Sequence, residues 1–181
     1  MKFSCVDGCS DCCINREYYP SEEFGKIGVL LLPEEKARIE RLAREKGVSV
    51  KILPRIALGE KPEKIIAYQM MGKQADGDLC PFLNEGNKSP HGGSACSIYK
   101  KRPLACSAYP IVDAGRNATL DPHCQFCAHH SDTASLEGLQ GELESLAKIK
   151  SAVKAGNSRV WRYATATGDL ATLKEGWVLE S

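Results

Sequence analysis

Cysteines are the residues of this chain whose types and spacing are best suited to chemistry. Four of them lie within the first thirteen residues, and the full set is Cys5, Cys9, Cys12, Cys13, Cys80, Cys96, Cys106, Cys124 and Cys127. Thiolates are soft ligands that suit zinc and iron–sulfur clusters. Because nine thiols are more than one tetrahedral site can use, the cysteine count predicts a metal-binding protein with more than a single four-ligand site.

The spacing of the thiols narrows the kind of metal site. Cys9-x₂-Cys12 and Cys124-x₂-Cys127 each permit both sulfurs to reach one metal or one cluster. Adjacent Cys12 and Cys13 project in different directions and are expected to bind different metal atoms. This favours a polynuclear centre, or two neighbouring centres, over a zinc finger that closes four ligands around one ion. Two 4Fe–4S clusters would use eight thiols, whereas zinc would occupy two or three sites with bridging sulfurs.

A disulfide framework is the main alternative use of so many cysteines. Such frameworks belong to oxidising compartments and usually to short secreted chains with an even number of thiols, whereas this chain has 181 residues and nine. Its first residues contain no apolar signal-peptide core, and its longest aliphatic stretch, Ile27 to Leu32, is too short to span a membrane. We therefore expect a cytoplasmic protein with reduced thiols, not associated with membranes.

Composition is consistent with one compact domain and says little about partners. The length is ordinary for a single domain, and 43% hydrophobic residues allow a modest core. The net charge is +1 with acidic and basic residues interleaved, so no basic stripe suggests nucleic acid. We expect residues 1–130 to form a ligand-bearing core and residues 131–181 to form a helix and tail that pack on it.

The elements that must position the thiols are short, apart from two helices. Pro33 followed by Glu34 and Glu35 is typical of a helix start, and Gly47 of its end. Leucines spaced on one face predict the longest helix, over Ser135–Lys154. Gly138 and Gly141 are expected to weaken its first turns. Apolar runs predict strands over 27–32, 48–53 and 65–70, and a loop rich in Gly, Asn and Ser over 84–94. The tail from Arg159, with Trp161, Tyr163 and Trp177, is expected to pack back on the domain.

The predicted fold is therefore α+β: a small, loop-rich single domain organised around a cysteine-ligated metal centre, with a long C-terminal helix.

Two later stretches, taken with the N-terminal cysteines, complete a recognisable pattern. The first is Cys80-Pro81-Phe82-Leu83. The second reads C-x-I-Y-x-x-R-P-x-x-C from Cys96 to Cys106 and is followed by the aromatic–proline pair Tyr109-Pro110. With the initial cluster, these motifs resemble the CxxCxxCC family of zinc- or iron-chelating proteins, also called YkgJ-like. The resemblance runs from Phe3 to about Cys124.

The resemblance implies a set of ligands. Cys5, Cys9, Cys12, Cys13, Cys80, Cys96 and Cys106 carry over, and so does Cys124. Two departures stand out: three residues separate Cys5 from Cys9 where the family has two, and Cys127 is additional to the usual set. The family is also similar to the cysteine-rich part of flagellin lysine methylases, which implies iron–sulfur chemistry.

Several neighbours of the thiols have both a structural and a functional interpretation. Pro81, Phe82, Ile98 and Pro103 are expected to fix the directions of the thiols by packing, and Tyr99 and Tyr109 to lie in the core. Arg102 is either a donor to an anionic thiolate cluster or a surface arginine. The histidines near the thiols, His123, His129 and His130, are within sequence reach of a metal, but second-shell or solvent-facing positions are the commoner outcome.

Three functions remain open at this stage. The first is a metal-cluster protein, most simply holding 4Fe–4S clusters, that serves electron transfer or sulfur and redox chemistry. The second is an enzyme with an open coordination position, of sulfur-transfer or methylase-like type. The third is a structural zinc module that binds a protein partner. Cys5-x₃-Cys9-x₂-Cys12 matches the spacing of radical SAM enzymes, but the chain lacks the length and the βα alternation of their barrel. The sequence identifies no substrate and no catalytic residue.

Overall fold

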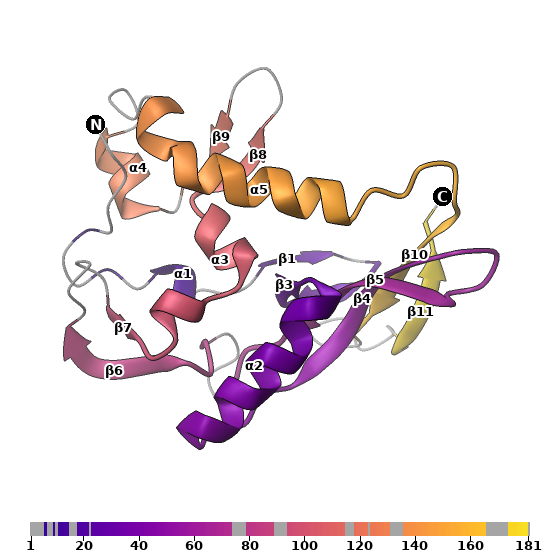
Figure 1. Cartoon of the computed structure of the whole chain (residues 1–181), viewed down its shortest axis with the longest axis horizontal. Coiled ribbons are helices and arrows are strands. Elements are labelled where there is room, and N and C mark those ends of the chain that lie inside the picture. Colours follow the sequence, from indigo (N-terminus) through magenta and orange to yellow (C-terminus); the bar gives the residue numbers. More distant parts are fainter. Residues whose placement is uncertain are drawn as a thin grey trace.

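The fold divides into a sheet region and a region of short elements that carry the cysteines. The computed structural model describes residues 6, 9, 11–14, 18–21, 23–73, 79–88, 94–114, 118–122, 124–130, 136–165 and 174–180. In Figure 1 the five-stranded sheet and α2 occupy one side of the molecule, and the short elements α1, α3, α4, β6 and β7 occupy the other.

The main sheet is antiparallel throughout, with strand order β11-β10-β4-β5-β3. Its strands are β3 (Val29–Leu31), β4 (Ile52–Leu58), β5 (Lys64–Met70), β10 (Val160–Ala164) and β11 (Gly176–Leu179). The tail therefore packs back on the domain as predicted, since β10 pairs with β4. Trp161 fastens this junction, because its indole Nε1 donates to the carbonyl of Gly59 at 2.9 Å.

Strand predictions for this sheet were partly right. The apolar run 65–70 is β5, as expected, and the run 27–32 is split by Gly28 into β2 (Gly25–Ile27) and β3. A Cβ atom at position 28 would lie 2.4 Å from the carbonyl oxygen of Met70, so only glycine fits there. The prediction of a strand over 48–53 was wrong: β4 begins at Ile52, whose partner across the ladder is Met70.

Helix α2 (Pro33–Lys46) follows the local signals closely. Pro33 and the acids Glu34 and Glu35 form its first turn, and it ends at Gly47, which has a left-handed φ of 64°. Its buried face, which includes Ile39 and Leu42, packs on β3 and β5. This contact forms the centre of the hydrophobic core, which also contains Val29, Leu31, Ala43, Met70, Leu79, Cys80, Phe82, Leu83 and Ile98.

The buried amide of Gln69 holds an irregular part of the sheet together. Its Oε1 accepts the backbone N–H of Gly28 at 2.9 Å, and its Nε2 donates to the carbonyl of Pro54 at 2.9 Å. Pro54 lies where the register of β4 against β5 shifts, and Gly28 lies between β2 and β3. The 1% exposed Gln69 therefore bonds to the backbone at two interruptions of regular strand structure.

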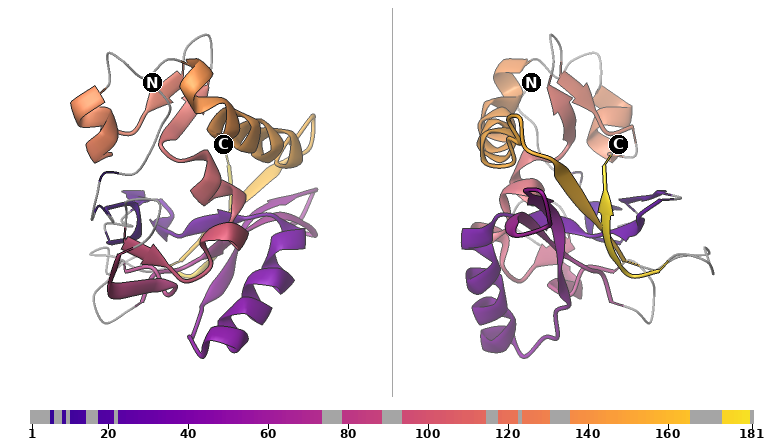
Figure 2. Two further views of the ribbon diagram at one scale, coloured as in Figure 1. Left: turned by 60° about the vertical axis from the view of Figure 1, so that its left-hand side comes forward. Right: turned by 90° about the vertical axis from the view of Figure 1, so that its right-hand side faces the viewer.

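The remaining elements are short. They are α1 (Asp11–Ile14), β1 (Tyr18–Ser21), β6 (Leu83–Lys88), β7 (Ser94–Cys96), the 3₁₀ turn η1 (Tyr99–Lys101), α3 (Leu104–Ala108), β8 (Ile111–Ala114), β9 (Ala118–Leu120) and α4 (Gln125–His130). β1 pairs with β2, β6 with β7, and β8 with β9. In both views of Figure 2, α4 and the β8–β9 hairpin lie at the end of the molecule opposite α2.

Two further expectations needed correction. The segment 84–94, predicted as a loop, contains β6 up to Lys88, because pairing with β7 overrides its polar composition. The helix predicted over Ser135–Lys154 is shorter: the 3₁₀ turn η2 (Leu136–Leu139) precedes α5 (Gln140–Ala152). At thirteen residues, α5 is slightly shorter than α2, which has fourteen.

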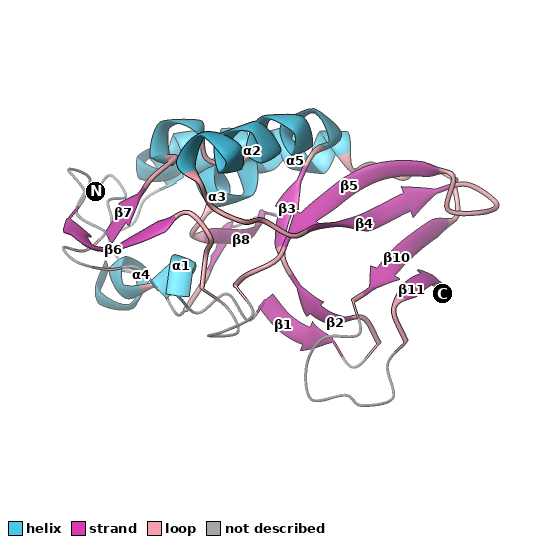
Figure 3. Cartoon of the chain, turned by 90° about the horizontal axis from the view of Figure 1, so that it is seen from below, coloured by secondary structure: helices cyan, strands magenta, loops and turns pink. Residues whose placement is uncertain are grey.

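The arrangement is α+β, as predicted, with three of the helices on one side of the main sheet. Figure 3 shows α2, α3 and α5 on this side, and α3 contacts both α5 and β3. Thus α3, which carries Cys106, is held between the long helices and the sheet. No helix in the described ranges combines the length and the apolar character needed to span a membrane.

Candidate metal centre

Eight of the nine cysteines are described, and no disulfide joins any two of them. Cys5 lies outside the described residues, so its predicted role cannot be placed. The Sγ atoms of Cys12 and Cys13 are 4.0 Å apart, about twice the ~2.05 Å of a disulfide bond. The two members of the vicinal pair are therefore not joined by a disulfide.

Four thiols contact the main hydrophobic core, and we call Cys13, Cys80, Cys96 and Cys106 the inner cysteines. Cys80 is part of this core at 4% exposure, and the other three pack against it. The backbone N–H of Cys80 donates to the carbonyl of Cys13 at 2.7 Å, which joins the N-terminal segment to the CPFL motif. The inner cysteines therefore come from four separate parts of the sequence and share one core.

Two of the inner cysteines lie on short elements: β7 of the β6–β7 hairpin carries Cys96, and α3 carries Cys106. Leu83, at the start of β6, pairs with Cys96 at the end of β7, and Leu83 N–H donates to the Cys80 carbonyl at 3.1 Å. Phe82 is 1% exposed and fills the space behind this turn. Together with buried Pro81, Ile98 and Pro103, it packs as the sequence predicted.

The C-terminal pair, Cys124 and Cys127, lies in a second apolar cluster. Cys124, Phe126 and Cys127 are buried there, and Val6, Tyr109 and Leu120 pack against them. A side-chain hydrogen bond joins Cys127 to Cys124. Burial, followed by the proximity of Cys124, raises the pKa of Cys127 to about 12, so this thiol keeps its proton at neutral pH unless a metal displaces it.

Tyr109 links this pair to the N-terminal cysteines. Burial raises the pKa of its half-buried phenol above the ordinary range, and Cys124, Asp121 and Cys12 raise it further. Cys12 and Cys124 therefore both lie near Tyr109, while Cys13 packs on the main core. The two vicinal cysteines thus have different neighbours.

Sequence reasoning missed Asp121 and treated Tyr109 only as a core residue. Tyr109 forms a side-chain hydrogen bond with Asp121, whose carbonyl also accepts the N–H of Cys124 at 3.1 Å. The available signal was the position of Asp121 in the segment Asp-Pro-His-Cys, where Asp and Pro are typical of a turn. Tyr99, also predicted to be in the core, is 36% exposed instead.

Arg102 has a structural partner on each side. Its guanidinium lies 4.0 Å from the centre of the Tyr99 ring, and its Nε donates to Ser107 Oγ at 3.1 Å. These contacts hold Arg102 beside the residue that follows Cys106. Of the histidines, His123 and His91 lie outside the described residues, and only the backbone of His129 and His130 is described, in α4.

The cysteine side chains have the chemistry of a thiolate-bound metal centre, but the described ones are not gathered into one ion site. In the described part of the chain, no three Cys, His, Asp or Glu side chains converge into a ready-made ion site. The 4.0 Å between the Sγ atoms of Cys12 and Cys13 is near the roughly 3.8 Å expected for two sulfurs on one tetrahedral ion with 2.3 Å bonds.

Comparison with known proteins identifies one family. A sequence model named CxxCxxCC and described as a "putative zinc- or iron-chelating domain" matches residues 4–128, a span that holds all nine cysteines. No match was found among curated proteins or among solved structures.

Proposed function

Because the chain belongs to the CxxCxxCC family of zinc- or iron-chelating domains, we propose that its cysteines hold one or more iron–sulfur clusters. A cluster so bound would supply one-electron chemistry, for electron transfer or for sulfur and redox reactions. Thiolates are the usual ligands of such clusters, and 4Fe–4S centres use four each. The chemistry of the donors and the family are the starting points of this proposal.

The observation that carries the proposal is the division of the thiols. Cys13, Cys80, Cys96 and Cys106 contact one core, and Cys12 and Cys124 approach Tyr109 beside a second. Four inner cysteines would satisfy one Cys₄-ligated cluster. Cys9, Cys12, Cys124 and Cys127 would then be available for a second, leaving Cys5 as the ninth thiol, and the vicinal pair would bridge the two.

A zinc site remains the alternative, and one distance favours it. The 4.0 Å between the Sγ atoms of Cys12 and Cys13 suits two ligands of a single tetrahedral ion. In that case the domain would be a structural zinc module, whose role would be to present a surface to a protein partner.

A cellular location and a domain organisation can be proposed from the same thiols. We infer a cytoplasmic location, because reduced cysteines persist there. We also infer that residues 1–181 act as one unit, with the ligands in 1–130 and the remainder packed on them; the pairing of β10 with β4 and the contact of α5 with α3 support this.

Metal analysis of anaerobically purified protein tests the proposal. We expect brown protein with iron and acid-labile sulfide in comparable amounts, and a lower iron content after Cys80→Ser or Cys124→Ser. If each replacement removes about half of the iron, the thiols form two separate clusters of equal size. Colourless protein carrying stoichiometric zinc after iron-replete expression would refute the iron–sulfur proposal and establish the zinc alternative.

A further inference from the structure

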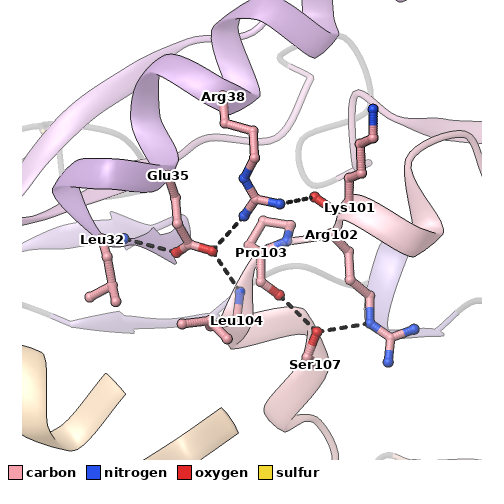
Figure 4. Close-up of polar contacts among 8 residues, drawn as sticks. All are labelled: Leu32, Glu35, Arg38, Lys101, Arg102, Pro103, Leu104 and Ser107. Carbon is pink, nitrogen blue, oxygen red and sulfur yellow. Dashed lines mark hydrogen bonds and ion pairs between the residues drawn. The ribbon is translucent and has the colours of Figure 1, made fainter. Parts of the chain in front are cut away.

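We propose that Glu35 and Arg38 are positioning residues that set the direction of the Cys106 thiol. This inference rests on the proposed function, because it concerns the presentation of one inner cysteine to metal. The two residues are one helical turn apart on α2, and together they hold the chain segment that leads into α3 (Figure 4). We call Glu35 and Arg38 the α2 clamp.

The carboxylate of Glu35 joins the starts of two helices. Its Oε2 accepts the backbone N–H of Leu32 at 3.0 Å, at the beginning of α2. Its Oε1 accepts the backbone N–H of Leu104 at 2.9 Å, at the beginning of α3. One side chain thus fixes the position of α3 relative to α2.

Arg38 makes the second half of the clamp. Its Nη2 donates to Glu35 Oε1 at 2.9 Å, and its Nη1 donates to the carbonyl of Lys101 at 2.7 Å. The segment from Lys101 to Leu104 is therefore held at both ends, with buried Pro103 between them. In Figure 4, both side chains of the clamp point from α2 toward this segment.

Helix α3 depends on this external support. It has five residues, and its N-cap, Pro103, supplies no side-chain hydrogen bond. A helix this short is not stable alone, and its first N–H groups have no partner within the helix. Glu35, 69 residues away in sequence, provides the missing acceptor for one of them.

The burial of Glu35 indicates that the contact is specific. Its side chain is 4% exposed, whereas that of Arg38 is 32% exposed. A buried carboxylate is strongly unfavourable unless it is paired and hydrogen-bonded, and the three donors to Glu35 meet this need. Displacing α3 would leave this charge without one of its donors, so the carboxylate resists rotation of the helix.

Cys106 is the third residue of α3, and its direction follows that of the helix. Ser107 adds a second restraint, because its hydroxyl bonds to the Pro103 carbonyl at 3.3 Å and accepts from Arg102 Nε. The clamp therefore connects α2 in the sheet region to an inner cysteine. Its predicted effect is to keep Cys106 oriented before metal binds, which slows loss of that metal.

The test uses four variants of the full chain: Glu35→Ala, Glu35→Gln, Arg38→Ala and, as a control, Glu40→Ala. Glu40 is on the same helix and pairs with Lys36 at 2.6 Å, but its side chain is 37% exposed. The measurements are the rate of metal loss to EDTA, hydrogen exchange in the segment from Lys101 to Ala108, and alkylation of Cys106 by iodoacetamide. Alkylation of Cys127 is the internal reference.

Glu35→Ala and Arg38→Ala should each expose the segment and Cys106. Loss of a hydrogen bond to a charged group predicts about tenfold faster exchange and metal loss in Glu35→Ala, with Cys127 unchanged. Glu35→Gln should retain most of the effect of Glu35, because its amide oxygen still accepts from Leu104. Glu40→Ala should behave as the parent protein.

Three results separate this inference from the proposed function. Folded Glu35→Ala with parental exchange, alkylation and metal loss would overturn the clamp while leaving metal binding intact. If Glu35→Ala does not fold, Arg38→Ala provides the same test, because it removes the contact with the Lys101 carbonyl but keeps the hydrogen bond from Leu104 to Glu35. Parental exchange, alkylation and metal loss in Arg38→Ala would then overturn the clamp. A parent protein that contains neither iron nor zinc would overturn the proposed function, and the clamp's role in metal retention with it.

Discussion

The sheet region and the cysteine region are stabilised in different ways. The sheet region comprises α2 and the strands β3, β4, β5, β10 and β11. Its two longest strands, β4 and β5, have seven residues each, and Leu31, Ile39 and Ala57 are fully buried. Hydrophobic burial and strand pairing across five strands are sufficient to stabilise such an arrangement.

The cysteine region comprises α1, α3, α4 and the β6–β7 and β8–β9 hairpins. Its helices have four to six residues and its strands three to six. Isolated helices and two-stranded hairpins of this size are marginal in water. These elements carry Cys12, Cys13, Cys96, Cys106 and Cys127, so ligation would supply the stability that they lack.

Removal of metal should therefore affect the two regions unequally, and this is the largest effect we expect. Structural metal sites contribute on the order of 10 kcal/mol to folding. Chelation should raise hydrogen exchange strongly in β6, β7, α3 and α4, while β4 and β5 remain protected. Hydrogen exchange with mass spectrometry, before and after EDTA treatment, measures both regions in one sample.

A uniform loss of protection would contradict this difference. It would show instead that the metal organises the whole domain, which is what the thiol count alone suggested. Equal protection with and without EDTA would mean that the short elements are stable without ligation.

Local signals explain which parts of the fold could be predicted from the sequence. Helix α2 was predicted almost to its ends, because Pro33 and Gly47 act within the helix itself. β4 was displaced, because alternation at Val48 and Val50 imitates a strand, whereas the real ladder is fixed by pairing of Ile52 with Met70. Pairing between distant segments is not encoded in any one of them.

The candidate site shows the same limit. The cysteines were found from their spacing, since ligand types and short intervals are visible in sequence. Glu35 was seen only as a helix-start residue, because its partner Leu104 is 69 positions away. Tyr109 and Asp121 were missed as a pair for the same reason: their hydrogen bond forms only when β8 and β9 have paired.

Phe82 is where the two regions meet, and its removal should have the next largest effect. It is 1% exposed and belongs to the same core as Leu31 and Ile39, although it follows Cys80 by only two residues. Phe82→Ala should lower the free energy of unfolding by about 3–5 kcal/mol. It should also lower metal content, because the turn that holds Cys80 loses its packing.

Ile39→Val is the matched control for Phe82→Ala. Ile39 is fully buried in α2, a helix that carries no cysteine, so this change should lower stability by about 0.5–1.5 kcal/mol and leave metal content unchanged. Urea unfolding and metal analysis of both variants are the measurements. Parental metal content in Phe82→Ala would show that the cysteine region does not depend on the shared core.

The smallest effect concerns an exposed ion pair between α5 and the cysteine region. Lys150 Nζ of α5 lies 2.6 Å from Asp113 Oδ1 of β8. The hydrogen bond from Lys150, followed by that from the backbone of Ala114, lowers the pKa of Asp113 below its usual value. A carboxyl whose pKa is lower in the folded state stabilises the fold above its unfolded pKa of about 3.9, and this contribution disappears as pH falls through the folded pKa.

Asp113→Asn should therefore lower the melting temperature slightly at neutral pH and have no effect in acid. Both side chains are exposed, so added salt should weaken the difference as well. Glu45→Gln removes a comparable pair in the sheet region, Arg41 to Glu45 at 3.8 Å, and serves as the control. The measurement is the melting temperature of parent and variants between neutral pH and about pH 2, below the unfolded pKa of aspartate. A difference for Asp113→Asn that persists at the acid end would mean that β8 is attached to α5 by packing, with no contribution from this charge pair.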